Sequence, residues 1–150
     1  MQSIQIKYQR ADLEMMRQLI KVFGEAFEDA DSYESKPPSD DYLISLLGRE
    51  DFIPLVAIAD NKVVGGLAAY VLKKFEQERS EIYVYDLAVL EDFRRRHIAT
   101  DLINHLQKIA TEIGAWVVYV QADYGDDPAI KLYESLGKRE DVLHFDIEPK

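Results

Sequence analysis

The sequence contains no cysteine, which excludes disulfides, thiolate metal ligands and a cysteine nucleophile. It also has no apolar run long enough to span a bilayer, and its N-terminal stretch lacks the basic and then apolar order of a signal peptide. No Gly-rich nucleotide fingerprint occurs, and the histidines show no metal-ligand spacing, so we expect no metal. These absences predict a soluble, cytoplasmic protein without membrane contact.

Positive charge is scarce. The 150 residues include 18 Lys and Arg against 28 Asp and Glu, which gives a formal net charge of −10. Nucleic acid is not an expected partner, because its phosphates would be repelled. A negative potential favours cationic ligands, although solubility alone also accounts for such a charge. The length suggests one domain, which we assign to residues 1–150.

The hydrophobic patterns predict an α/β fold with a mixed central sheet flanked by helices. Asp60 and Asn61 mark a hairpin turn, which excludes an all-parallel sheet, and Gly65 and Gly66 mark a bulge or a close backbone approach. Asp12 is a candidate helix cap. Expected strands cover residues 4–8, 52–59, 62–72, 81–90, 115–122 and 142–147, and expected helices cover 11–30, 41–48, 97–113 and 127–137.

A basic turn, "FRRRHIAT" at residues 93–100, lies between the strand 81–90 and the helix 97–113. A helix N-terminus has unpaired N–H groups and a partial positive charge, so it favours anions such as phosphate. Arg94, Arg95 and Arg96 would add donors at this position. The turn is therefore either an anion site or a solvated basic turn paired with Glu91 and Asp92.

This turn resembles the acyl-CoA-binding signature of the Gcn5-related N-acetyltransferase (GNAT) superfamily, which reads Arg or Gln, two residues, Gly, one residue, then Gly or Ala. Residues Arg94 to Ala99 match it, except that His97 stands in place of the glycine. A histidine there must turn its side chain away from the pyrophosphate, or the loop must shift. The segments "EIYVYDLAV", "YVQADYGDDPA", "LYESLG" and "HFDI" are similar to the aminoglycoside 3-N-acetyltransferases of type I.

The resemblance implies a single-domain GNAT fold and acetyl-CoA as cosubstrate. It further implies acetylation of the 3-amino group of the deoxystreptamine ring of aminoglycoside antibiotics, by direct attack in a ternary complex, with resistance as the result. It also implies a homodimer. Two alternatives stay open: the same chemistry on another polyamine or a protein amine, and a non-catalytic acidic binding module of the same fold.

The resemblance implies that the cofactor site combines a strand end, the basic turn and two helix starts. Its members are Leu87, Ala88, Val89, Arg94, Arg95, Arg96, His97, Ile98, Ala99, Thr100, Asp126, Ala129 and Tyr133. The phenol of Tyr133 would protonate the leaving thiolate, although a half-buried aromatic residue is the alternative interpretation. Asp126 also suits a helix N-cap.

Carboxylates are the expected contacts of a polycationic acceptor. Asp123 ends a strand at the edge of the sheet where ligands bind in open α/β folds, so it is the first candidate base. The resemblance implies Glu81 as the second, because it lies on the strand where many members of the superfamily place a glutamate base, displaced by two residues. By period two, Glu81, Tyr83 and Tyr85 share one face of their strand, and Asp86 points to the other. For Asp127 two roles stay open, capping of the helix and contact with the substrate. The expected substrate contacts are Tyr85, Asp86, Asp123, Asp127 and Asp146.

Overall fold

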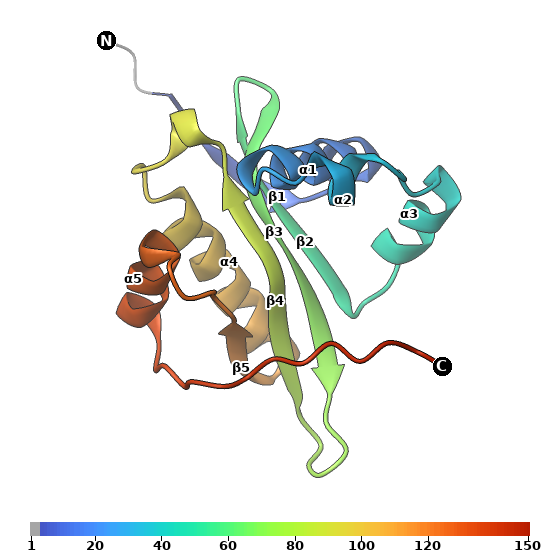
Figure 1. The fold of residues 1–150 in the computed structure, drawn as a ribbon, viewed down its shortest axis with the longest axis vertical. Coiled ribbons are helices and arrows are strands. Elements are labelled where there is room, and N and C mark those ends of the chain that lie inside the picture. The colour runs from blue at the N-terminus through green and yellow to red at the C-terminus, as the bar shows by residue number, and fades with distance from the viewer. Residues whose placement is uncertain (1–3) are drawn as a thin grey trace.

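A five-stranded mixed sheet forms the centre of the computed structural model, which describes residues 4–150 (Figure 1). Its strand order is β1-β2-β3-β4-β5; the first four strands are antiparallel to their neighbours, and β5 is parallel to β4. The strands are β1 (Lys7–Arg10), β2 (Phe52–Ala59), β3 (Lys62–Lys73), β4 (Ser80–Val89) and β5 (Ala115–Val120). The helices are α1 (Leu13–Ala26), α2 (Ala30–Glu34), α3 (Asp40–Leu47), α4 (Ile98–Ile113) and α5 (Asp127–Leu136), with a 3-10 turn at Glu91–Phe93. The α/β class and the mixed sheet predicted from the sequence are confirmed.

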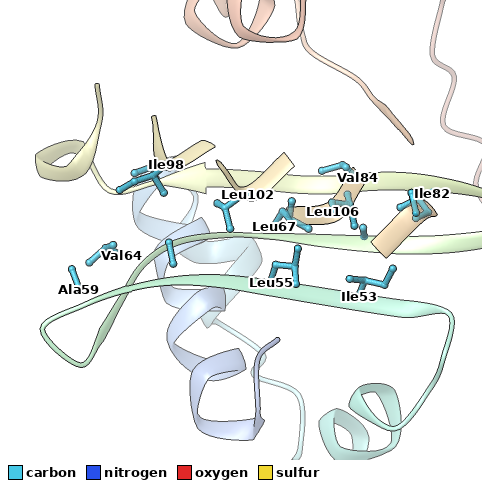
Figure 2. Close-up of a cluster of buried hydrophobic side chains, with 14 residues drawn as sticks. Ile53, Leu55, Ala59, Val64, Leu67, Ile82, Val84, Ile98, Leu102 and Leu106 are labelled. Atoms are coloured by element: carbon cyan, nitrogen blue, oxygen red, sulfur yellow. The ribbon is translucent and has the colours of Figure 1, made fainter. Parts of the chain in front are cut away.

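Helices pack on both faces of the sheet. On one face α4 buries Leu102 and Leu106 against Leu55, Leu67 and Val84, as Figure 2 shows. On the other face α1 and α3 bury a second apolar cluster against β2, β3 and β4. Each helix places its apolar residues on one face at 3.6-residue spacing, so each contributes a stripe to the core.

Helix α1 begins where the sequence predicts, because the side chain of Asp12 accepts a hydrogen bond of 2.9 Å from the amide of Met15. It lies close to β3 at Gly66. A Cβ atom at Gly66 would stand 2.5 Å from Leu19 Cδ1 and 2.5 Å from the carbonyl oxygen of Leu55. The close-approach interpretation of this glycine is therefore confirmed, and only glycine leaves α1 at this distance from the sheet.

A bulge in β4 changes which side chains share a face. Tyr83 pairs with Tyr70, and Asp86 pairs with Ala68, so Tyr85 is an extra residue between two regular pairs. Directly paired residues point to the same face, and Tyr70 and Ala68 are two residues apart. Asp86 therefore lies on the face of Tyr83. The expectation that Asp86 points to the opposite face is wrong, because strict alternation fails at a bulge.

The parallel pairing of β4 with β5 ends early. The last pair is Val84 with Val120, whereas β4 continues to Val89 beside β3. Beyond Val84 the edge of β4 that faced β5 has no strand partner. This opening leaves main-chain groups of residues 85–89 available for other partners.

Three expected elements differ from the structure. The first strand covers Lys7–Arg10 instead of 4–8. The helix expected over 11–30 ends at Ala26, before Glu28, whose φ is 53°, and α2 (Ala30–Glu34) follows it as a separate short helix. The final strand expected at 142–147 does not form, because no strand of the structure lies in register beside it. Within residues 4–150, no helix combines the length and the apolar character that a membrane span requires.

Candidate functional site

The N-terminus of α4 presents free amide groups. His97 occupies the N-cap position with φ 60° and ψ 18°, a left-handed conformation, and its side chain makes no capping hydrogen bond. The first intrahelical bond runs from the amide of Asp101 to the carbonyl of His97 at 2.9 Å. The amides of residues 98–100 therefore have no intrahelical acceptor, and the helix dipole adds partial positive charge there.

The basic turn lies in solvent directly before these amides. The Nε of Arg94 donates to the carbonyl of Val89 at 3.0 Å, and the guanidinium of Arg96 lies 5.6 Å from the centre of the Phe93 ring. Within residues 4–150 no ion pair joins any of the three arginines to Glu91 or Asp92. The expected pairing with Glu91 and Asp92 is therefore not seen among the described residues, and the anion site stays a prediction.

The turn follows the open edge of β4 in the chain. Residues Leu87, Ala88 and Val89 remain paired with β3 on one side only. On the far side of the opening, β5 ends at Val120 and leads into the exposed turn that contains Asp123. A thioester placed in the opening would meet main-chain donors of β4, with a helix N-terminus next to them.

Helix α5 begins with the acidic corner. The side chain of Asp126 accepts a hydrogen bond of 3.4 Å from the amide of Ala129, so Asp126 is the N-cap, as one of its two interpretations required. Asp127 is the first helical residue and is exposed. Asp123 is also exposed, and the described residues give its carboxylate no hydrogen-bond partner. In this corner, Asp126 therefore has a structural role as a helix cap, whereas Asp123 and Asp127 are exposed to solvent.

Tyr133 lies on α5, one residue after Leu132, and is half-buried. Burial raises the pKa of its phenol to about 12, and the charge of Asp126 adds to the effect. The phenol is therefore protonated throughout the neutral range, which is the state that a proton donor needs.

Asp86 is the carboxylate that the protein environment perturbs most clearly in this region. Its Oδ2 accepts a hydrogen bond of 2.9 Å from the hydroxyl of Tyr33 at the end of α2. Burial raises the pKa of Asp86, and the bond from Tyr33 opposes that rise. The pKa of Tyr33 is raised in turn, by burial first and then by Asp86. Sequence analysis missed Tyr33, because nothing in the sequence signals a contact between residues so far apart.

Four tyrosines continue the surface beside Asp86. We call this surface the tyrosine face; it consists of Tyr70, Tyr83, Tyr85 and Tyr119. The ring centres of Tyr83 and Tyr119 are 4.7 Å apart and stacked, and Tyr85 contacts Tyr70 at 5.9 Å and Tyr83 at 5.8 Å. The face spans three strands. Because Tyr85 is 62% exposed, it is available for contact with a ligand.

Two expected site residues pair with other side chains. Glu81 is at the start of β4, about 20 Å from Leu87 at roughly 3.3 Å per residue, and pairs with Lys74 at 3.4 Å. Asp146 is exposed near the C-terminus, and its Oδ1 lies 2.9 Å from Nε2 of His144. The part of the chain that the structure describes holds no cluster of three His, Asp or Glu side chains suited to a metal ion.

Comparison with known families and structures gives a consistent result. The model of the acetyltransferase (GNAT) family matches residues 14–138. A crystal structure of an aminoglycoside acetyltransferase from an uncultured soil metagenomic sample is 48% identical, with a TM-score of 0.93, over 99% of this chain and 100% of that chain. A second aminoglycoside acetyltransferase from such a sample, in complex with sisomicin, is 35% identical with a TM-score of 0.87, over 98% of this chain and 97% of that chain.

The curated relatives match a smaller part of this chain than the solved structures do. An N-alpha-acetyltransferase of Saccharolobus solfataricus is 35% identical over 92 residues, which is 54% of this chain and 53% of the relative. Across the curated proteins that it matches, the chain spans between 39% and 55% of their length.

Proposed function

The chain belongs to the acetyltransferase (GNAT) family, and from that membership we propose that it transfers the acetyl group of acetyl-CoA to an amine of an aminoglycoside. We assign this activity to residues 1–150 as one domain. The observation that carries the proposal is the exposed, uncapped N-terminus of α4 beside the open edge of β4. Full-length similarity to two aminoglycoside acetyltransferases supports the choice of acceptor.

The α4 N-terminus is the proposed site of the CoA pyrophosphate. The amides of residues 98–100 and the side chains of Arg94, Arg95 and Arg96 supply donors and positive charge. The left-handed conformation of His97 is one that glycine adopts freely. The loop therefore keeps the backbone that the family signature encodes with glycine, and the imidazole is exposed.

The thioester is proposed to lie in the opening between β4 and β5. Those N–H groups of Leu87, Ala88 and Val89 that point into it would stabilise the oxyanion that forms when the amine attacks. Tyr133 would give its proton to the departing thiolate. Attack is proposed to be direct, in a ternary complex, and the chain has no cysteine whose thiol could carry the acetyl group.

The acceptor amine must lose a proton before or as it attacks. Two carboxylates border the opening and are proposed for this step, Asp86 on β4 and Asp123 after β5. Asp86 is the better placed, because it comes directly before Leu87 and burial raises its pKa toward that of a useful base. Glu81 is the less suitable candidate, because of its distance along β4 and its ion pair with Lys74.

The rest of a polycationic acceptor is proposed to lie over the tyrosine face, with Tyr85, Asp123 and Asp127 as contacts. Ammonium groups are attracted to aromatic faces and to carboxylates. Acetylation converts one ammonium into a neutral amide. A drug that depends on its positive charge to bind ribosomal RNA would thereby lose affinity, and resistance would follow.

A peptide amine is the second candidate acceptor, because two of the curated relatives are N-alpha-acetyltransferases. The test is release of CoA from acetyl-CoA with sisomicin, spermidine and a basic peptide, each as sole acceptor. We expect turnover with sisomicin alone, and NMR of the product would show the acetylated nitrogen, expected at position 3 of the deoxystreptamine ring. Turnover with the peptide alone would favour the second candidate. CoA release with none of them would leave only a binding module.

A further inference from the structure

Apolar packing holds α4 against the sheet. Ile98, Leu102 and Leu106 of this helix are buried in the cluster that Figure 2 shows. The hydrophobic effect is non-directional, whereas a hydrogen bond requires its donor and its acceptor in one geometry. The apolar side chains therefore keep the helix on the sheet, and a polar contact to the sheet would fix the position of its first turn more narrowly.

Such a polar contact exists at one place. The hydroxyl of Tyr8 on β1 donates a hydrogen bond of 2.8 Å to Oδ2 of Asp101, which lies in the first turn of α4. Among the side-chain hydrogen bonds and ion pairs of residues 4–150, this bond is the only one that joins α4 to another helix or strand. The position of the first turn therefore depends on Tyr8 more than on any other polar side chain of the sheet.

Both the backbone and the ring of Tyr8 are held in place. Its backbone pairs with Ala57 of β2, and its ring lies against His105, with the ring centres 5.0 Å apart. His105 follows Asp101 by one helical turn, so Tyr8 contacts two successive turns of α4. Burial raises the pKa of the Tyr8 phenol, and Asp101 raises that pKa further. The phenol is therefore protonated throughout the neutral range and remains the donor of this bond.

The bond from Tyr8 ends on the residue that closes the first turn. The amide of Asp101 makes the first intrahelical hydrogen bond, to the carbonyl of His97, and the free amides of residues 98–100 lie between these two residues. His97 holds a left-handed conformation, which a non-glycine residue keeps only where the surrounding structure enforces it. The contacts from Tyr8 to Asp101 and from Asp101 to His97 are part of that enforcement.

The same bond controls where a negative charge lies. A carboxylate in the first turn of a helix is attracted by the partial positive charge of the N-terminus, and an aspartate side chain can reach nearby backbone amides. In that position the carboxylate of Asp101 would compete with a bound phosphate. The bond from Tyr8 holds this carboxylate on the side of β1 instead.

We propose that Tyr8 is a positioning residue for the acyl carrier. Acting through Asp101, it holds the first turn of α4 in the geometry that presents the amides of residues 98–100 to the CoA pyrophosphate, and it keeps the Asp101 carboxylate away from those amides. Tyr8 lies on β1, at the opposite edge of the sheet from the opening between β4 and β5, so it contributes to binding of acetyl-CoA and not to the chemical step. The inference rests on the proposed function.

The first test removes only the hydroxyl, because Tyr8→Phe keeps the ring against His105. We expect the Kd of CoA, measured by isothermal titration calorimetry, to rise on the order of fivefold, and the KM for acetyl-CoA to rise with it. The kcat and the KM for the acceptor should stay at their wild-type values, since only binding of the carrier is affected. Tyr42→Phe removes a phenol that is 63% exposed on α3 and should leave the Kd of CoA unchanged. Unchanged binding of CoA by Tyr8→Phe would overturn the proposal.

A double-mutant cycle shows whether Tyr8 acts through Asp101. In an Asp101→Ala background the hydroxyl has no acceptor, so Tyr8→Phe should leave the Kd of CoA unchanged there. Asp101→Asn keeps an oxygen that accepts from Tyr8 and removes the charge, so this variant should bind CoA at least as tightly as wild type. An equal effect of Tyr8→Phe in both backgrounds would mean that the hydroxyl acts by another route. Weaker binding of CoA by Asp101→Asn would contradict the role given to the hydrogen bond.

Amide hydrogen exchange tests the inference without any ligand. In Tyr8→Phe, exchange of the Asp101 amide should be faster on the order of fivefold, because the first turn opens more often. The amide of Ala110, which is buried near the other end of α4, should exchange as in wild type. Equal exchange at Asp101 in both chains contradicts the proposal, whatever the acetylation assay shows. Equal affinity of wild type and Tyr8→Phe for CoA overturns this inference alone, whereas a wild-type chain that binds no CoA overturns the proposed function as well.

Discussion

His97 and Asp86 each occupy a position that costs stability. His97 holds a left-handed backbone conformation, and Asp86 holds a carboxylate in a half-buried site. Strain and desolvation of this kind persist mainly where binding or chemistry requires them. At the scale of single residues, backbone strain at His97 and desolvation at Asp86 therefore indicate a functional role more clearly than the type of amino acid does.

Replacing His97 by glycine should not lower stability. The left-handed conformation costs a non-glycine residue about 1–2 kcal/mol, and glycine adds about 0.5–1 kcal/mol of unfolded-state entropy. We therefore expect His97→Gly to match or slightly exceed the wild type in urea unfolding, with acetyl-CoA affinity retained. Gln107→Gly, at an exposed position inside α4, is the control and should lose about 1 kcal/mol. Equal losses in both variants would show that the left-handed turn is not populated.

Replacing Asp86 by asparagine should lower activity and raise stability. As a base, Asp86 is expected to contribute about 10²–10⁴-fold to kcat/KM. Its pKa is higher in the folded than in the unfolded chain, so the folded state loses stability as the pH rises through this interval. Asp86→Asn should therefore unfold at a higher temperature than wild type at neutral pH, and this gap should close in acid. An active, less stable variant would exclude the assignment.

The Tyr33 hydroxyl gives a further check on the same carboxylate. Its hydrogen bond lowers the pKa of Asp86 against the effect of burial. Tyr33→Phe removes that bond, so the acidic limb of the pH profile of kcat/KM should move to higher pH. The profile of Tyr42→Phe, on the exposed side of α3, should match the wild type. An unchanged limb in Tyr33→Phe would mean that a group other than Asp86 sets the profile.

At the scale of helices and strands, short sequence patterns predict most of the fold. They miss the features that depend on contact with another strand. The Asp12 cap, the Asp60 and Asn61 turn and the apolar stripe of α4 each lie in one short stretch, so the sequence reveals them. The bulge at Tyr85 has no local signal, and it decides the face of Asp86. The segment 142–147 has the pattern of a strand without a neighbouring strand, and pattern alone does not supply one.

The contact between α1 and β3 gives a test at this scale. Gly66→Ala should lower the free energy of unfolding by about 1–3 kcal/mol, because the added methyl group meets both Leu19 and a backbone carbonyl. Gly48→Ala is the matched control, since its nearest atom would be 3.5 Å away, and it should gain about 0.4–1 kcal/mol. Chemical denaturation measures both. A Gly66→Ala protein as stable as wild type would mean that α1 lies further from the sheet.

At the scale of the whole molecule, the charge distribution acts in different ways on the two proposed substrates. The net charge of −10 attracts a polycationic acceptor from a distance, while the arginines of the basic turn act on the acyl carrier locally. Long-range attraction is screened by salt, because the Debye length falls from roughly 30 Å at about 0.01 M to roughly 3 Å at about 1 M. Contacts made at the α4 N-terminus act over short distances, so they depend less on the Debye length.

The kcat/KM for an aminoglycoside should therefore fall steeply with ionic strength. Across that range we expect a loss of on the order of tenfold or more, because electrostatic steering contributes about 10–10³ to association. The kcat/KM for acetyl-CoA, measured with saturating acceptor, should change by a smaller factor. An acceptor with a single amine is the control, since one charge couples weakly to the summed field of the protein. Equal salt dependence for the polyamine and the monoamine would show that only local contacts select the acceptor, and that the acidic surface serves solubility alone.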